Sequence, residues 1–330
     1  MNLRFLAAFC FFWIATTHAA ECCTIPVFRF ALDRWEADRF KLVIPADVAA
    51  KPEILDLLRP LRASGKANLD ITTDRSGQAM RAELFSPQNG MRPVWTGELS
   101  AASLAALLDS PGRVALMNHI LEGDSVTWVI VDTGTPADDA EVERITKRLN
   151  FLQLAAALPV QDPNDPDSQL GPGPELKLEF RVMRLRLDDL AEKSLIAMLA
   201  GPEGKVDASK PFAAAVFGRG RVLGAWQLSQ LNETGLEDAC MFLIGRCSCR
   251  VKNENPGWDL LMNVDWVKAL EKIADQRKTS VKPNTLVPKP QVTDTAHVAV
   301  DTSKSDEGTR WMFWSGFILL GLALLMLSRK

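Results

Sequence analysis

The sequence predicts an α/β protein built from two similar units, each a mixed central sheet flanked by helices, with a single transmembrane helix at its C-terminal end. Two observations lead to this prediction. The apolar residues of 26–108 switch repeatedly between helical and strand spacing, and a similar series begins after residue 112. Both ends of the 330-residue chain are apolar, whereas the residues just before the C-terminal apolar run are hydrophilic.

The periodicity assigns elements to each unit. In the first unit, residues 21–110, we expect helices at 26–36, 52–63 and 100–108 and strands at 40–44, 68–73, 80–85 and 93–97. In the second, residues 111–275, we expect helices at 113–121, 138–157, 188–200 and 233–245, strands at 126–131 and 178–187, and a hairpin at 211–226. An internal duplication explains both series. The Pro- and Asp-rich loop 159–175 is expected to be an insertion in the second unit.

Residues 210–226 (KPFAAAVFGRGRVLGAW) and the helix after them resemble the C-terminal half of a thioredoxin fold. In that fold a proline, usually cis, precedes an apolar strand, a glycine-containing turn, a second strand and a closing helix. Residues 85–108 are similar to the same ββα element, so the resemblance implies two thioredoxin-like units, with a cis bond before Pro211. Residues 23–35 together with 247–257 also resemble an uncharacterised family of exported bacterial proteins, which implies no activity.

The resemblance also implies where a redox site would lie. Redox-active members of the thioredoxin superfamily carry CxxC at the start of the helix after the first central strand, where the helix N-terminus lowers the thiol pKa. That position reads PADV at 45–48 in the first unit and DTGTP at 132–136 in the second. Because neither contains Cys, both units are expected to be redox-inactive.

Residues 1–20 have the pattern of a secretory signal peptide. Arg4 supplies the charge, residues 6–14 the apolar core and residues 17–20 the small-residue exit. We therefore expect the folded part to be exported to the periplasm or another extracytoplasmic space. The residues before Cys22 do not form a lipoprotein box, so no lipid anchor is expected.

Residues 311–328 predict a transmembrane helix. They lie between Arg310 and the basic pair Arg329-Lys330, and as a helix they would span about 27 Å, close to the hydrocarbon thickness of a bilayer. The basic pair indicates the cytoplasmic side, which predicts a single-pass, type I protein of the cell (inner) membrane. Residues 276–310 hold few large apolar residues and are expected to be a disordered tether.

Charge and histidine content exclude several classes of site. The net charge is −3 with both signs interspersed, which argues against a nucleic-acid partner. His119 is the sole histidine between leader and tether, so a multi-His metal site is excluded and a Ser-His-Asp triad would need that ring. We assign His119 no role, and no cofactor is expected.

Of the six cysteines, one lies in the leader, and those that remain are Cys22, Cys23, Cys240, Cys247 and Cys249. Thiols of exported proteins tend to oxidise, and bridges between near neighbours close strained rings. We therefore favour long-range disulfides that join the N-terminal pair and Cys240 to the CxC segment. Two alternatives stay open: a Cu or Zn thiolate site built from Cys240, Cys247 and Cys249, and a thiol–disulfide couple that uses Cys23 or the CxC pair.

Two further patterns have simple structural explanations. The GRGR run at 218–221 could bind phosphate, but its apolar flanks predict a hairpin turn. Asp162, Asp165 and Asp167 could bind Ca²⁺, but they lack the Gly and bidentate Glu of a calcium loop, which favours a solvated loop.

These features predict a membrane-anchored, extracytoplasmic binding or accessory protein with a protein partner at the membrane. The alternative is a thiol–disulfide or Cu/Zn thiolate-handling protein that uses Cys240, Cys247 and Cys249. The missing CxxC motifs favour the first function, and the sequence leans against an enzyme.

Overall fold

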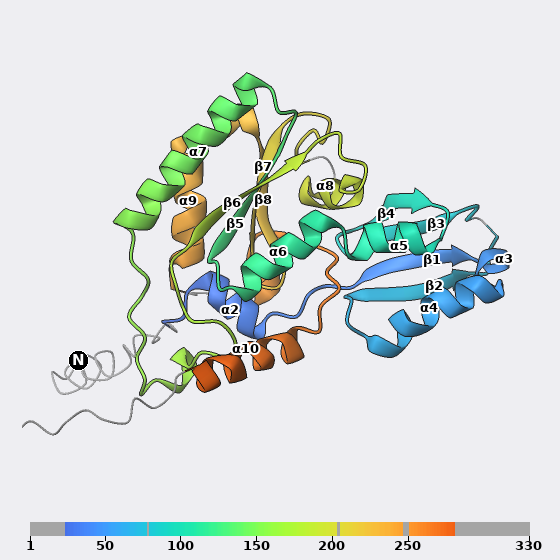
Figure 1. Cartoon of the computed structure of the whole chain (residues 1–330), viewed down its shortest axis with the longest axis horizontal. Coiled ribbons are helices and arrows are strands. Elements are labelled where there is room, and N and C mark those ends of the chain that lie inside the picture. The colour runs from blue at the N-terminus through green and yellow to red at the C-terminus, as the bar shows by residue number, and fades with distance from the viewer. Residues whose placement is uncertain (1–23, 78, 203–204, 247–250, 281–330) are drawn as a thin grey trace, which may run out of the picture. The chain divides into compact units, whose positions relative to one another are not determined.

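A computed structural model describes residues 24–77, 79–202, 205–246 and 251–280, which form an α/β fold with two mixed sheets flanked by helices (Figure 1). The predicted signal peptide, transmembrane helix 311–328 and tether from residue 281 onward lie outside the described residues. Within the described ranges, no helix combines the length and the apolar character that a membrane crossing requires.

The first sheet has the strand order β2-β1-β3-β4. Its strands are β1 (Phe40–Pro45), β2 (Leu69–Asp74), β3 (Ala82–Ser86) and β4 (Asn89–Gly97). β1 runs parallel to β2 and antiparallel to β3, and β3 and β4 form a hairpin with register shifts around Phe85. The helices of this region are α3 (Ala46–Ala49), α4 (Pro52–Ser64) and α5 (Ala101–Leu108).

Local sequence explains how these helices begin and end. α4 begins with Pro52, at a position where a backbone N–H would have no partner within the helix. Its C-cap is Gly65, which adopts a φ of 58°. α5 begins with a capping box in which Ser100 and Ser103 exchange hydrogen bonds with each other's backbone N–H. Both helices pack on the face of the sheet that carries Phe40, Leu42, Ile44 and Leu84.

The second sheet has the order β6-β5-β7-β8-β9. Its strands are β5 (Val126–Asp132), β6 (Phe180–Arg186), β7 (Phe212–Phe217), β8 (Arg221–Gln227) and the short β9 (Trp258–Asp259). The first four repeat the strand directions of the first sheet. The helices are α6 (Pro111–Leu121), α7 (Pro136–Ala155), α8 (Lys193–Leu199) and α9 (Glu233–Ile244), with short 3-10 turns at Pro166–Ser168, Leu228–Gln230 and Lys252–Glu254.

Helices cover both faces of the second sheet. On one face, α7 and α9 lie side by side (Figure 1), and with α2 (Val27–Arg34) they bury Trp128 and Ile130. On the other face, α6 and α8 pack over Val129 and Val131, which share one continuous hydrophobic core with the covered face of the first sheet. The two sheets therefore meet through buried apolar side chains.

The expected helices and strands are present, but the helix expected to open the first unit packs on the second sheet instead. Val27 N donates to Gly245 O at the end of α9, and Trp35 packs edge-on against Phe217 of β7. Arg29 of α2, buried to 2% exposure, donates to Pro174 O (2.6 Å) and Gly171 O (2.8 Å) and so holds the long loop after α7. Apolar periodicity predicted this helix but did not tell which sheet it covers.

Two further expectations are corrected. The helix α10 (Trp266–Ser280) was not predicted, and it continues past the expected boundary at residue 275, where Arg277 in its last turn donates to Gly173 O (3.1 Å). The Lys210–Pro211 bond is trans, so the expected cis bond is wrong. A cis bond needs a turn that demands it. Here Lys210 N already closes a turn onto Asp207 O, and Pro211 O accepts from Leu228 N at 2.9 Å.

Candidate functional site

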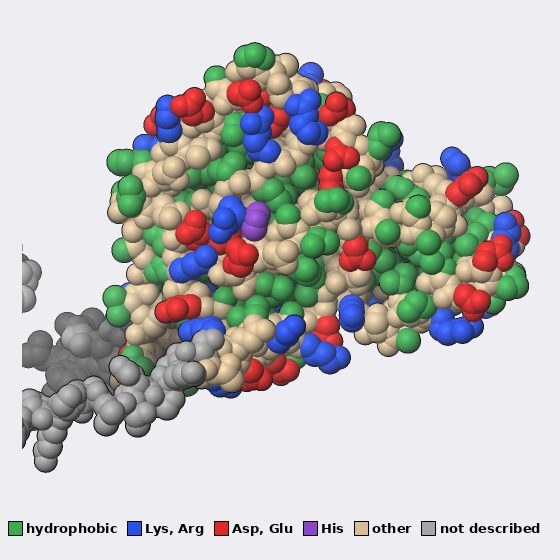
Figure 2. Space-filling model, in the orientation of Figure 1, with side chains coloured by type: hydrophobic (Ala, Val, Ile, Leu, Met, Phe, Trp, Pro, Cys, Tyr) green, Lys and Arg blue, Asp and Glu red, His purple; other side chains and the backbone are tan. Residues whose placement is uncertain are grey.

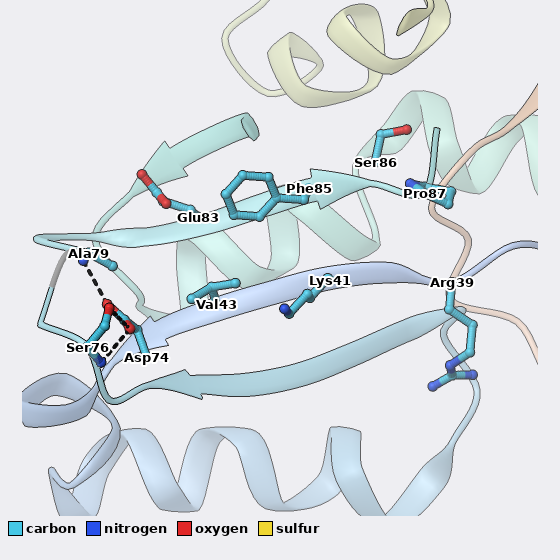
Figure 3. A pocket seen from close by; sticks show the side chains of 10 residues that line it. All are labelled: Arg39, Lys41, Val43, Asp74, Ser76, Ala79, Glu83, Phe85, Ser86 and Pro87. Carbon is cyan, nitrogen blue, oxygen red and sulfur yellow. Dashed lines mark hydrogen bonds between the residues drawn. The ribbon is translucent and has the colours of Figure 1, made fainter. Parts of the chain in front are cut away.

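The first sheet carries a hollow of about 510 Å³ on the face opposite α4 and α5 (Figure 3). Its floor is formed by Lys41 and Val43 of β1 together with Glu83 and Phe85 of β3. Lys41 lies opposite Phe85 and Val43 lies opposite Glu83 in the antiparallel register, so all four side chains share one face. The hollow is therefore a property of the sheet itself.

The connection between β2 and β3 explains why this face is open. The described residues of this connection, 75–77 and 79–81, form no helix, whereas the matching connection in the second sheet carries α8. Asp74 shapes the short loop, because its carboxylate accepts hydrogen bonds from Ser76 N (2.8 Å), Ser76 Oγ (2.6 Å) and Ala79 N (2.8 Å). The loop forms one end of the hollow (Figure 3).

Opposite charges line the hollow at its two ends. Arg39 and Lys41 lie at the start of β1, and Arg39 is held by Asp70 at 2.7 Å and by Leu69 O at 2.7 Å. Glu83 lies toward the other end, beside the loop that Asp74 organises. Among the described residues, neither the Lys41 ammonium nor the Glu83 carboxylate has a hydrogen-bond or ion-pair partner. The hollow thus offers a ligand the Lys41 ammonium and the Glu83 carboxylate, on either side of the apolar side chains of Val43 and Phe85.

The position expected for a redox motif in the second unit holds an ion-pair network. Asp132 is fully buried at the end of β5, accepts from Arg184 Nε (2.8 Å) and Nη2 (3.0 Å), and lies 3.7 Å from Arg186 Nη1. Hydrogen bonds to Asp132 and Asp139 raise the pKa of the Arg184 guanidinium above its ordinary value. Thr135 caps α7 and accepts from Asp138 N at 3.3 Å. These groups fix the start of α7 and supply no thiol.

The corresponding position of the first unit also lacks a thiol. β1 ends at Pro45, and the short helix α3 begins with Ala46 and Asp47. Both positions expected for a CxxC motif are therefore ordered helix starts that hold residues other than Cys.

Among the cysteines, the structure describes Cys240 alone. It is a free thiol at 0% exposure on α9, in the core beside Trp128, and burial raises its pKa to about 12. Cys22, Cys23, Cys247 and Cys249 lie outside the described residues. An antiparallel bridge between Pro26 and Arg246 brings the described neighbours of these two cysteine pairs together.

The remaining candidates have structural roles. The 218–221 run forms the expected turn, with positive φ at Gly218 and Gly220, and Arg219 donates to Leu32 O (2.8 Å). Asp162 and Asp165 accept backbone N–H groups of their own loop. In the described part of the chain, no group of three His, Cys, Asp or Glu side chains is placed to hold a metal ion.

His119 lies partly exposed on α6, on a protein whose surface carries interspersed acidic and basic side chains (Figure 2). Burial lowers its pKa, and the nearby charge of Arg181 lowers it further. Asp124 and Glu122 oppose this shift. Because this pKa lies below the ordinary value of 6.5, the ring is mostly neutral near pH 7.

Sequence reasoning missed the hollow of the first sheet. Two signals were available. A charged residue alternates with apolar ones in both strands, Lys41 in FKLVI and Glu83 in AELF, and the connection between β2 and β3 is too short for a covering helix. No family model, no curated protein and no solved structure matches this chain.

Proposed function

We propose that the protein is a membrane-anchored, extracytoplasmic binding or accessory protein built on two redox-inactive thioredoxin-like units. The observation that carries this proposal is the start of α7. Where a redox-active relative would present a thiol, this chain has buried Asp132 clamped by Arg184. The clamp leaves no group there that could form a mixed disulfide, whereas the open face of the first sheet can bind a partner.

The arrangement of strands supports the thioredoxin-like part of the proposal. Each sheet contains an antiparallel hairpin that is followed by a helix: β3, β4 and α5 in the first, and β7, β8 and α9 in the second. Each also pairs its first strand in parallel with the next strand along the chain. The trans bond before Pro211 and the missing helix between β2 and β3 are departures from that fold.

The anchoring part rests on the sequence of the two ends. The leader at 1–20 directs export, and 311–328 provides the anchor. Full-length protein should therefore stay with membranes after an alkaline wash, and deletion of 311–330 should release a soluble exported form. Retention of the truncated protein on washed membranes would contradict the single anchor.

The binding function is tested with the full chain solubilised from membranes. We expect it to show no thiol–disulfide exchange above background with a disulfide-bonded test protein. We also expect it to retain a partner on affinity capture, with less partner bound by Lys41→Glu than by Lys272→Glu, a surface control on α10. Disulfide exchange, or equal capture by both variants, would overturn the proposal.

The alternative, a thiol- or metal-handling protein, depends on the CxC segment. The bridge between Pro26 and Arg246 supports a structural role, since Cys23 lies three residues before Pro26 and Cys249 three residues after Arg246. A disulfide between Cys23 and Cys249 is the pairing we expect. Stoichiometric Cu or Zn in the purified protein, or a free-thiol count that shows both residues reduced, would favour the alternative.

A further inference from the structure

We propose that the hollow of the first sheet is one end of a groove that binds an extended peptide segment of the partner, with an acidic and a basic side chain two positions apart. This inference rests on the proposed binding function and names the chemical class of its ligand.

A second hollow extends the first. It has a volume of about 560 Å³ and meets the first at Arg39 and Pro87, which line both. Its far wall is formed by Arg221, Asn253 and Asn255. The first hollow alone follows β1 from Arg39 to Val43, about 13 Å at 3.3 Å per residue. The two hollows together extend beyond this length, which suits an extended chain better than a compact small molecule.

The far wall is held in place before any ligand arrives. Arg221 is nearly buried, donates to Asp259 (3.0 Å) and to Gly257 O (3.0 Å), and lies 5.7 Å from the centre of the Trp35 ring. Lys252 pairs with Asp38 at 2.8 Å and with Asp259. A wall that is already ordered adds little entropic cost to binding.

The floor determines the charge pattern of the ligand. Lys41 and Glu83 lie diagonally across two paired strands, with Val43 and Phe85 at the other two corners. Alternate side chains of an extended peptide point the same way and are about 7 Å apart, which matches this diagonal. A carboxylate would meet Lys41 and an ammonium would meet Glu83. Charge-assisted contacts of this kind are about twice as strong as neutral ones.

The test measures fluorescence anisotropy of labelled pentapeptides on the detergent-solubilised full chain. The probes have Thr at both ends and Glu-Val-Lys, Lys-Val-Glu, Gln-Val-Gln, Lys-Val-Lys or Glu-Val-Glu in the centre. We expect at least one of the two mixed-charge peptides to bind about tenfold more tightly than the neutral one. Lys41→Glu should shift the preference to Lys-Val-Lys, and Glu83→Lys should shift it to Glu-Val-Glu.

Equal binding of all probes, or preferences that neither substitution changes, would overturn the inference. Binding that appears only after deletion of 281–330 would also overturn it, because the chain's own C-terminal segment would then be the occupant. If no peptide binds but Lys41→Glu still reduces capture of the partner, the peptide class is wrong while the proposed binding function stands.

Discussion

The two sheets share the order of four strands, but helices cover both faces of the second sheet and one face of the first. In both sheets the first strand has a parallel strand on one side and an antiparallel hairpin on the other. All of β5 is buried because helices cover both faces of its sheet, whereas β1 alternates between buried Leu42 and exposed Lys41. A sheet of this plan can therefore leave one face uncovered if that face is partly polar, and the face is then available for binding.

The largest expected effect concerns the core that joins the two sheets. Arg113 on α6 is 1% exposed, donates to Leu261 O, and is close to the buried carboxylate of Glu192. Burial lowers its pKa to about 10 against the raising effect of Glu192 and Asp109. Arg113→Ala leaves the carbonyl of Leu261 without its donor and opens a cavity in the core, so it should cost about 3–5 kcal/mol, measured by urea unfolding.

The control for this variant is Arg39→Ala on the first sheet. Arg39 pairs with Asp70, and both side chains are about half exposed. Solvent screens such a pair, so the loss should stay below about 1 kcal/mol. Similar losses for the two variants would show that the joined core does not depend on the buried charge.

The second prediction concerns the cysteines that flank the second sheet's helices. If Cys23 and Cys249 are joined, the disulfide ties the start of α2 to the end of α9, and Cys23→Ser with Cys249→Ser should lower stability by about 2–4 kcal/mol. Thermal unfolding with and without reductant measures the loss, and peptide mapping identifies the bridge. Cys22→Ser is the matched control, and an equal effect from it would contradict the pairing.

A pair of valines compares the two sheets directly. Val129 lies at 0% exposure under α6 and α8, while Val43 is half-buried on the open face. Val129→Ala should lower the free energy of unfolding by about 2 kcal/mol, because it removes two buried methylene equivalents and leaves a cavity. Val43→Ala should lower it by less than about 1 kcal/mol. If Val43→Ala proves as costly, the open face is covered in the intact protein.

The smallest effect concerns the thiol of Cys240. Because burial raises its pKa to about 12 from 9.0, the folded state favours the protonated form. Its stabilising contribution is complete below pH 9 and is lost as the pH rises toward 12, since the unfolded thiol ionises first. At pH 8 we expect iodoacetamide to modify Cys240 only in denaturant. Rapid alkylation of the native protein would place the thiol at the surface.

The sequence predicted the helices and strands well because their signals are local. Val126 to Val131 form one apolar run, and Ser100, Gly65 and Pro52 mark helix ends, so no distant contact is needed to recognise them. The site was harder to find, since Lys41 and Glu83 become neighbours only through a register set across forty residues of chain. Strand β9 was also missed, because Trp258 and Asp259 form too short a strand to show a period.

The position of α2 has a consequence for how the chain matures. Its residues leave the ribosome before those of the other described helices and strands, yet they pack on α9 and β7, which emerge some two hundred residues later. Until then its apolar side chains have no surface to cover them, and contacts of such large sequence separation form slowly. The newborn chain therefore carries an aggregation-prone N-terminal helix through most of its synthesis, and a chaperone that shields it would raise the yield of folded protein.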